Sequence, residues 1–236
     1  VLFRSEDGLS YTVPEDLLAH WRHPALLLSQ TCGYPLVTLL ANVQTVGCFH
    51  YSAPGCEGRN YRSLLVAREA DGGKSLADFH GRRVACNSPD SQSGYNVLLK
   101  MIAPLSRDGR FFSTVAFSGS HRQSLRELQQ GTADIAAIDC VTWALLQRHQ
   151  PEALAGLTVI AHSPLAPGLP LITSATTPAA TLELLREALQ QLVSDERYQP
   201  LCEALFICGY SDMRRADYQP LLAWREEAAA RGVVRL

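Results

Sequence analysis

The sequence predicts an α/β fold of two lobes, with mostly parallel sheets flanked by helices. Short apolar segments of strand length alternate with amphipathic helices, and loops of small polar residues join the two. The chain has 236 residues, 47% of them apolar, which is enough for one large domain or two small lobes with a sizeable core. No internal repeat or low-complexity tract interrupts this alternation.

The predicted strands are short and rich in aliphatic residues, and Gly, Pro or small polar residues bound them. They cover 26–28, 43–49, 61–67, 83–86, 114–117, 134–138, 157–161 and 169–173.

Helices fill most of the intervals between these strands. Ser75 is the predicted cap of a short helix over 76–79, and Gly81 ends it. A Thr177-Pro178 pair starts a later helix whose leucines recur at helical spacing on one face. The other helices begin at Tyr95, surround Leu125 and Leu128, and cover 141–149 and 221–231.

Two crossings between lobes are predicted, near Arg82 and over 163–168, and both are hinge candidates. The first lobe is then discontinuous, with residues 1–81 and 169–236, and residues 82–168 form the central lobe. Closure of the lobes on a ligand is the expected conformational switch.

Charge and hydropathy exclude several classes of partner. Lys and Arg number 21 against 23 Asp and Glu, for a net charge of −2, which argues against nucleic acid and anionic membranes. No apolar run approaches the roughly 20 residues of a membrane span. No signal peptide is visible, but residues 1–5 look like translated adapter sequence, so we expect the natural start to be missing.

The seven cysteines predict neither a metal site nor a cofactor site, because no Cys-x-x-Cys pair occurs and no His lies near two of them. Buried, reduced thiols are the leading interpretation. A Cys48–Cys56 bridge is the alternative for an exported protein.

Two polar loops offer an anion site. Residues 91–94 (Ser-Gln-Ser-Gly) and 118–121 (Ser-Gly-Ser-His) each join a predicted strand to a helix. At such positions free backbone N–H groups and the helix dipole attract an anion. The alternative for each loop is plain helix capping, for which Ser is preferred anywhere. Neutral donors dominate both loops, which suits reversible capture.

Four segments in order also resemble a known family. Residues 84–96, 118–125, 131–139 and 163–170 are similar to motifs of PhnD-like proteins, which bind phosphate, phosphite or phosphonate for ABC importers. The resemblance implies a type II periplasmic-binding-protein fold with a cleft between the lobes. It also implies a monomer without catalysis or cofactor, a small oxyanion ligand, an ABC permease as partner and a periplasmic location, although a cytoplasmic one stays open.

The resemblance implies ligand contacts from both lobes, with Tyr61 approaching from the lobe opposite to the two polar loops. The implied ligand-binding residues are Gln30, Thr31, Tyr34, Tyr61, Ser91, Gln92, Ser93, Gly94, Tyr95, Ser118, Ser120, His121 and Asp139.

Two features depart from the family pattern. Val141 stands where aminophosphonate-binding members have a Glu, and Leu169 occupies another position where an acid can occur. Asp139 is the one obvious acid left, so an aminophosphonate is not the expected ligand. The family's first strand is also expected to be truncated or absent.

Two other functions stay open. An enzyme on the same scaffold, as in menaquinone- or thiamine-pathway enzymes, would use Cys32, His121 and Asp139 as thiol, imidazole and carboxylate. A ligand-sensing module would use the same cleft and report to a partner protein.

Overall fold

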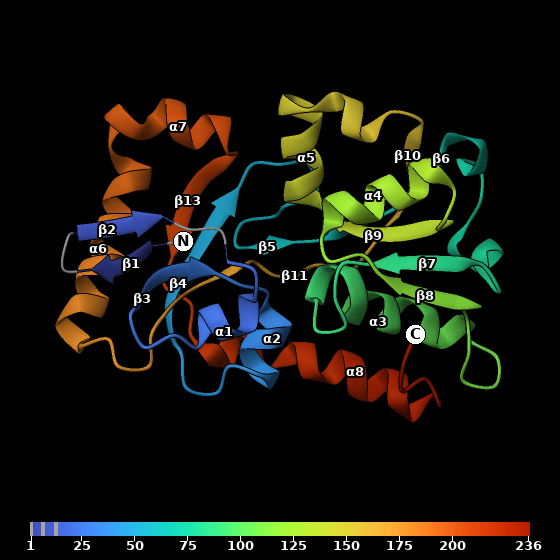
Figure 1. Ribbon diagram of the computed structural model, residues 1–236, viewed down its shortest axis with the longest axis horizontal. Helices are drawn as coiled ribbons and strands as arrows, with labels where there is room; N and C mark the ends of the chain where they lie inside the picture. The colour runs from blue at the N-terminus through green and yellow to red at the C-terminus, as the bar shows by residue number, and fades with distance from the viewer. Residues whose placement is uncertain (1, 6–7, 12–13) are drawn as a thin grey trace. The chain divides into compact units, whose positions relative to one another are not determined.

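The chain divides into two compact units in a computed structural model that describes residues 2–5, 8–11 and 14–236. Unit 1 consists of residues 1–52 and 167–219, and unit 2 consists of residues 53–166 and 220–236. Each unit is a sheet with helices, so the predicted two-part α/β architecture is confirmed. Figure 1 shows the elements of each unit.

The predicted crossing near Arg82 is wrong. Strand β6 (Ser63–Arg68) pairs with β9 (Ile135–Asp139) and β10 (Leu157–His162), so it lies inside the sheet of unit 2. The chain therefore enters unit 2 at residue 53, returns to unit 1 at 167 and re-enters unit 2 at 220. The second of these positions lies within the predicted crossing over 163–168.

The expectation of mostly parallel sheets is also wrong. In unit 2 the strand order is β10-β6-β9-β7-β8, and only the pairs β7–β8 and β7–β9 are parallel. In unit 1 the order is β13-β4-β12-β3-β1-β2, and the described pairings are antiparallel. The strands not yet bounded are β1 (Leu2–Ser5), β2 (Gly8–Tyr11), β3 (Leu26–Gln30), β4 (Gln44–Tyr51), β5 (Asn60–Tyr61), β7 (Arg83–Cys86), β8 (Thr114–Phe117), β11 (Ala166–Pro167), β12 (Pro170–Thr173) and β13 (Ile207–Ser211).

The exclusion of residues 2–5 from the fold as adapter sequence is wrong, because these residues form strand β1. The backbone of residues 2–5 pairs with both β2 and β3 and extends the sheet of unit 1. Val1, which belonged to the same excluded segment, lies outside the described residues.

Helices cover both faces of the sheet in unit 2 (Figure 1). Alternate residues of β7 and β9 contribute to a core that is completed by α3 (Val97–Ile102) and α8 (Pro220–Ala230). On the opposite face α4 (His121–Gln130) contacts β7 and β9, and its Leu125 and Leu128 are fully buried. The other helical segments of this unit are α5 (Cys140–His149), the π-helical turn η3 (Gln92–Asn96), and the 3-10 turns η1 (Glu69–Asp71), η2 (Leu76–Phe79), η4 (Ala103–Leu105) and η5 (Pro151–Leu154).

In unit 1, α6 (Ala179–Ser194) packs its predicted leucine face on the sheet. Leu189 is buried with Val46, Leu171 and Tyr210, and Leu182, Leu185 and Leu192 lie against this cluster. The remaining helical segments are α1 (Leu17–Trp21), α2 (Gly33–Thr38), η6 (Glu196–Tyr198), α7 (Gln199–Ala204) and η7 (Arg215–Tyr218). Within the described residues, no helix is long and apolar enough to cross a membrane.

The parallel part of the unit 2 sheet positions the candidate site. Strands β9, β7 and β8 are neighbours and run in the same direction, so their carboxyl ends lie at one edge of the sheet. From that edge β7 leads into η3, β8 into α4 and β9 into α5. Three helix starts therefore gather where open α/β sheets bind ligands.

Candidate functional site

The first helix start is built by Ser91 and Gly94. The Ser91 hydroxyl accepts a hydrogen bond from the Gly94 N–H at 3.0 Å, and the Ser91 carbonyl accepts one from the Asn96 N–H at 2.9 Å. A Cβ added at Gly94 would lie 1.9 Å from Asn87 Oδ1. Glycine is needed at this position because the Asn87 side chain, which the sequence analysis did not single out, already occupies the space.

The second helix start is capped by Ser120, whose hydroxyl accepts from the Gln123 N–H at 3.1 Å. The N–H groups of His121 and Arg122 belong to the first turn and have no intrahelical acceptor. Ser118 stabilises the turn itself: its Oγ lies 2.7 Å from Ser124 Oγ and 2.9 Å from the Ser120 carbonyl.

Asp139 builds the third helix start. Its carboxylate accepts from the Thr142 N–H at 2.8 Å and also from the Thr142 hydroxyl. Asp139 is therefore a helix cap, as are Ser91 and Ser120, so the capping interpretation holds for all three residues. Capping leaves open whether the same groups also contact a ligand.

One set of side chains joins these helix starts, and we name it the Ser93 cluster: Ser63, Ser93, His121 and Asp139. Ser93 Oγ lies 2.8 Å from His121 Nε2, and the same nitrogen lies 3.7 Å from Asp139 Oδ2. The Ser63 hydroxyl donates to the Ser93 carbonyl at 2.8 Å, and Ser63 is the register partner of Asp139. Ser63, Ser93 and Asp139 are buried, with Ser93 only 2% exposed, and His121 is partly buried.

The surroundings of His121 favour its neutral imidazole. Burial lowers the pKa of His121, although the Asp139 carboxylate and the Ala137 carbonyl act in the opposite direction. Among the described residues, the hydrogen-bond and ion-pair partners within the cluster include no Lys or Arg. An anion bound here would be held by hydroxyl, imidazole and backbone N–H donors.

The geometry does not match a Ser-His-Asp catalytic triad. In a triad, Asp orients one ring nitrogen while the other accepts the Ser proton. Here Ser93 and Asp139 both approach His121 Nε2. The imidazole cannot relay a proton between the two on this arrangement.

Two predicted residues direct their polar atoms elsewhere in unit 2. The Gln92 amide oxygen accepts from Asn96 Nδ2, which also donates to the carbonyl of Leu221 in α8. The Tyr95 hydroxyl accepts from the Leu236 N–H at 3.3 Å, and its ring stacks against Phe117.

Tyr61 belongs to the same unit as the two polar loops. It is the second residue of β5 and is 2% exposed, and residues 53–166 all belong to unit 2. The expectation that Tyr61 approaches from the opposite lobe is therefore wrong. The cause is the misplaced crossing, which assigned residues 53–81 to the wrong lobe.

In unit 1 the three predicted residues lie where β3 leads into α2. Gln30 Nε2 donates to the Tyr51 hydroxyl at 3.0 Å, and Tyr34 is buried in the first turn of α2. The Thr31 backbone N–H donates to the Pro170 carbonyl, but its buried hydroxyl has no hydrogen-bond partner among the described residues.

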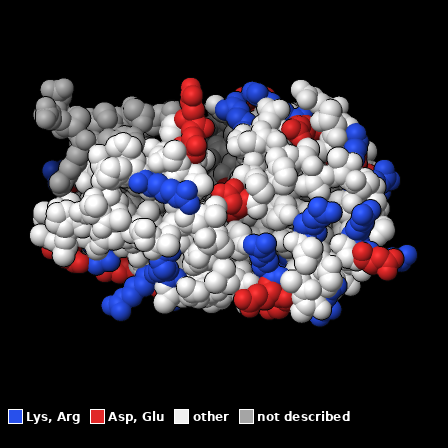
Figure 2. All heavy atoms as spheres, turned by 60° about the horizontal axis from the view of Figure 1, so that its bottom comes forward, with Lys and Arg blue, Asp and Glu red and all other residues white. Residues whose placement is uncertain are grey.

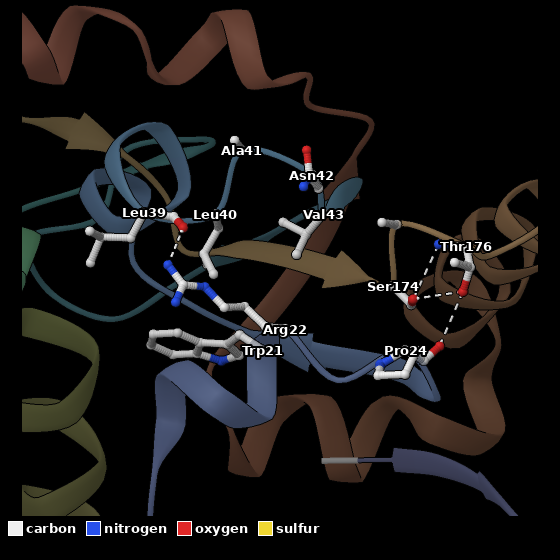
Figure 3. Close-up of a pocket in the computed structure, with 11 residues that line it drawn as sticks. Trp21, Arg22, Pro24, Leu39, Leu40, Ala41, Asn42, Val43, Ser174 and Thr176 are labelled. Carbon is white, nitrogen blue, oxygen red and sulfur yellow. Dashed lines mark hydrogen bonds between the residues drawn. The ribbon is translucent and has the colours of Figure 1, made fainter.

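A surface pocket of about 460 Å³ in unit 1 contains none of the predicted residues (Figure 3). It lies where β3 and β4 begin, which is the end of β3 opposite to Thr31. Its one charged lining residue is Arg22, whose guanidinium donates to the Leu39 carbonyl at 2.8 Å. The pocket therefore adds nothing to the anion site.

The sequence analysis missed Ser63 and Asn87. Ser63 is a single polar residue in an otherwise apolar strand, and Asn87 directly follows strand β7. A buried polar residue such as Ser63 needs a partner, and that requirement is the signal by which Ser63 could have been found. Asn87 is only partly buried, and its Oδ1 has no hydrogen-bond partner among the described residues. The described residues contain no group of three or more His, Cys, Asp or Glu that could hold a metal ion.

On the face shown in Figure 2, the described residues form no broad field of one charge sign. Figure 2 shows Lys and Arg interspersed with Asp and Glu on the face in view, with most of that face uncharged.

The chain has the type II periplasmic-binding-protein fold, an α/β fold built from two units. PhnD1 from Prochlorococcus marinus, in complex with methylphosphonate, has a TM-score of 0.74 at 13% identity over 90% of this chain and 82% of its own. The binding protein component of an ABC phosphonate transporter from Pseudomonas aeruginosa has a TM-score of 0.77 at 19% identity, with coverages of 91% and 72%. XAC2383 from Xanthomonas citri, bound to ATP, has a TM-score of 0.67 at 14% identity, with coverages of 92% and 82%.

A family model defines the chain further. Residues 37–218 match the model described as ABC transporter, phosphonate, periplasmic substrate-binding protein. The chain belongs to this family of non-catalytic binding components, whose members work with a small ligand and a permease. No curated protein sequence matches the chain. The comparisons support the resemblance inferred from the sequence and give no support to the enzyme alternative.

Proposed function

We propose that this chain is a monomeric, periplasmic binding protein that captures a phosphate-, phosphite- or phosphonate-like anion at the Ser93 cluster for an ABC permease. The observation that carries the proposal is the 2.8 Å contact between Ser93 Oγ and His121 Nε2. It brings together polar side chains from two strand–helix turns, each at the start of a helix. Helix starts supply the N–H groups and positive dipole ends that an oxyanion needs.

The Ser93 cluster suits a tetrahedral anion that carries a proton. When Nε2 carries the proton of neutral His121, it donates to Ser93 Oγ, and the Ser93 O–H can then donate to an anionic oxygen, whereas the buried Asp139 carboxylate can only accept. A P–OH group satisfies that acceptor, and sulfate at neutral pH has no such proton. We therefore propose selectivity for a protonated phosphorus oxyanion over sulfate.

The other predicted residues are also proposed ligand contacts, and the observations that support them differ. Ser91, Gly94, Ser118 and Ser120 shape the two helix starts, and the proposed contacts are the first-turn N–H groups there that have no intrahelical acceptor, such as those of His121 and Arg122. In unit 1, Thr31 has the best support because its buried hydroxyl lacks a partner among the described residues. The remaining proposed contacts, with support from the family resemblance alone, are Gln30, Tyr34, Tyr61, Gln92 and Tyr95.

Isothermal titration calorimetry tests the proposal with methylphosphonate, phosphate, phosphite, 2-aminoethylphosphonate and sulfate. We expect binding of at least one phosphorus oxyanion and none of sulfate. The key variant is Ser93→Ala, because a buried site accommodates the loss of a hydroxyl group better than replacement by a larger side chain. A hydrogen bond to a charged group contributes about 1.5–3 kcal/mol, so affinity should fall roughly 10- to 100-fold.

Ser113→Ala is the matched control. Ser113 directly precedes β8 at the end of that strand opposite to Ser118, and its exposed hydroxyl donates to the Arg82 carbonyl. We expect this variant to bind as the wild type does. Wild-type affinity in Ser93→Ala would place the site elsewhere, and no heat from any phosphorus oxyanion with folded protein would refute the proposed ligand class.

A further inference from the structure

A pair of thiols in unit 2 lies next to the candidate site but has no part in it. Cys56 Sγ and Cys140 Sγ are 3.4 Å apart, although the two residues are 84 positions apart in the chain. Cys56 lies in the segment that follows the entry into unit 2, and Cys140 is the first residue of α5. A Cys48–Cys56 bridge was the alternative expected for an exported protein. The structure instead places Cys140 next to Cys56, and Cys48 donates to the Phe49 carbonyl.

We propose that Cys56 and Cys140 are a thiol pair that an external disulfide oxidant converts into a disulfide bond. Neither residue is part of a disulfide bond in the structure. Their sulfurs need to approach by little more than 1 Å, since a disulfide bond is about 2.05 Å long.

The main chain that directly precedes Cys56 packs closely against Cys140. A Cβ added at Gly55, which precedes Cys56, would lie 3.1 Å from Cys140 Cβ and 3.3 Å from Cys140 Sγ. Gly55 has a φ of +99°, a conformation that non-glycine residues rarely adopt. The loop thus holds Cys56 against the start of α5 through main-chain geometry and not only through side-chain packing.

The two thiols differ in exposure, and the surroundings of Cys140 favour its thiolate. Cys56 is partly exposed and can meet an oxidant, whereas Cys140 is buried. The Cys56 hydrogen bond lowers the pKa of Cys140, whose place at a helix N-terminus also favours the thiolate. Cys86 provides the contrast, because burial raises its pKa to about 12.

The reaction is a thiol–disulfide exchange with a small-molecule or protein disulfide. The Cys56 thiolate attacks one oxidant sulfur, which breaks the oxidant's S–S bond and releases one thiolate. The Cys140 thiolate then attacks Cys56 Sγ and displaces the second oxidant sulfur. Two electrons pass from the cysteines to the oxidant, whose two sulfurs leave as thiols with the two protons. The product ties the entry segment of unit 2 to the helix that Asp139 caps.

Oxidised glutathione is the probe, and peptide mapping of the alkylated, non-reduced protein is the readout. We expect a linked Cys56–Cys140 peptide, two hydrogen atoms lighter than the two reduced peptides together. The oxidised protein should also melt at a higher temperature than the reduced protein. Cys56→Ser should abolish both effects. Cys208→Ser, which removes an exposed thiol, should change neither.

Ligand binding plays no part in this test, so its outcome is independent of the proposed function. Alkylation of Cys56 and Cys140 as free thiols after exposure to the oxidant would overturn the proposal. So would a Cys56 linkage to any cysteine other than Cys140, or an unchanged melting temperature once the Cys56–Cys140 linkage is present.

Discussion

Replacing Asp134 by Asn should remove the ion pair that anchors the start of strand β7. The Asp134 carboxylate accepts from Arg68 Nη2 at 2.9 Å and from Arg83 Nη2 and Nε at 2.8 and 2.9 Å. It also accepts from the Arg83 backbone N–H at 3.1 Å. The Asp134 side chain is only 8% exposed, so its negative charge is stabilised mainly by the two arginines and little by water.

The expected loss of stability follows from this burial. Breaking a fully buried pair costs about 3–5 kcal/mol. The side chains of Arg68 and Arg83 are 31% and 45% exposed, so water recovers part of that loss. We expect about 2 kcal/mol for Asp134→Asn, which lowers the melting temperature by roughly 4–8 °C in a chain of this size.

The effect should depend on pH with a definite sign. The hydrogen bonds from Arg83 and Arg68 hold the pKa of Asp134 far below its ordinary value. A lowered carboxyl pKa stabilises the fold above the unfolded-state value of about 3.9 and loses that contribution as the pH falls further. The difference in free energy of unfolding between wild type and Asp134→Asn should thus be constant between roughly pH 5 and pH 8, and it should shrink below about pH 4.

Scanning calorimetry at pH 7 and in the acid range measures the difference, with Asp195→Asn as the matched control. Asp195 also pairs with an arginine, but Arg197 is 78% exposed. An exposed pair contributes little, so this control should melt as the wild type does. If Asp134→Asn also melts as the wild type does, the buried ion pair of Asp134 with Arg68 and Arg83 does not stabilise the fold.

Two further predictions concern the candidate site. Burial lowers the pKa of His121 below about 6.5, so the unfolded state binds more protons as the pH falls through that value and the wild type loses stability. His121→Gln should not lose this stability between about pH 7 and about pH 5.5, and urea unfolding at the two pH values measures the difference. Equal losses in wild type and variant would show that the pKa of His121 is not lowered. Gly94→Ala should destabilise by about 1–3 kcal/mol through the Asn87 clash, and Asn87→Ala in the same chain should relieve most of it. Denaturant unfolding of the single and double variants decides this, and strictly additive losses would exclude the clash.

Local patterns in the sequence predicted individual elements well. Strands over 83–86 and 114–117 have the bounds of β7 and β8, and the leucine face after Thr177 is the face that α6 buries. These features depend on a few neighbouring residues. The caps Ser91, Ser120 and Asp139 belong to the same group, because each accepts from an N–H three residues further on.

Sheet membership could not be predicted in the same way. The apolar run in β6 indicates a buried strand, but it does not specify which sheet contains the strand or in which direction its neighbours run. The lobe boundary, the mostly parallel sheet and the placement of Tyr61 were all wrong for this reason. Each depended on the antiparallel pairing of β6 with β9 and β10.

The contacts within the candidate site are non-local. Ser63 and Ser93 are 30 positions apart, and Ser93 and His121 are 28 apart. The family resemblance identified Ser93 and His121 as members of one site. It did not indicate that they touch each other, because that distance depends on how η3 and α4 follow neighbouring parallel strands.

The last residues of the chain have a particular consequence for synthesis on the ribosome. Residues 220–236 belong to unit 2, and fully buried Ala228 and Val233 lie in the core that includes α3. Every strand of that unit is translated well before these residues leave the exit tunnel. A nascent chain without residues 220–236 therefore carries all strands of the unit 2 sheet but leaves part of its apolar core uncovered, and unit 2 closes only after these residues have emerged. Chains that stop near residue 219 should expose this part of the core and become substrates for chaperones or proteases.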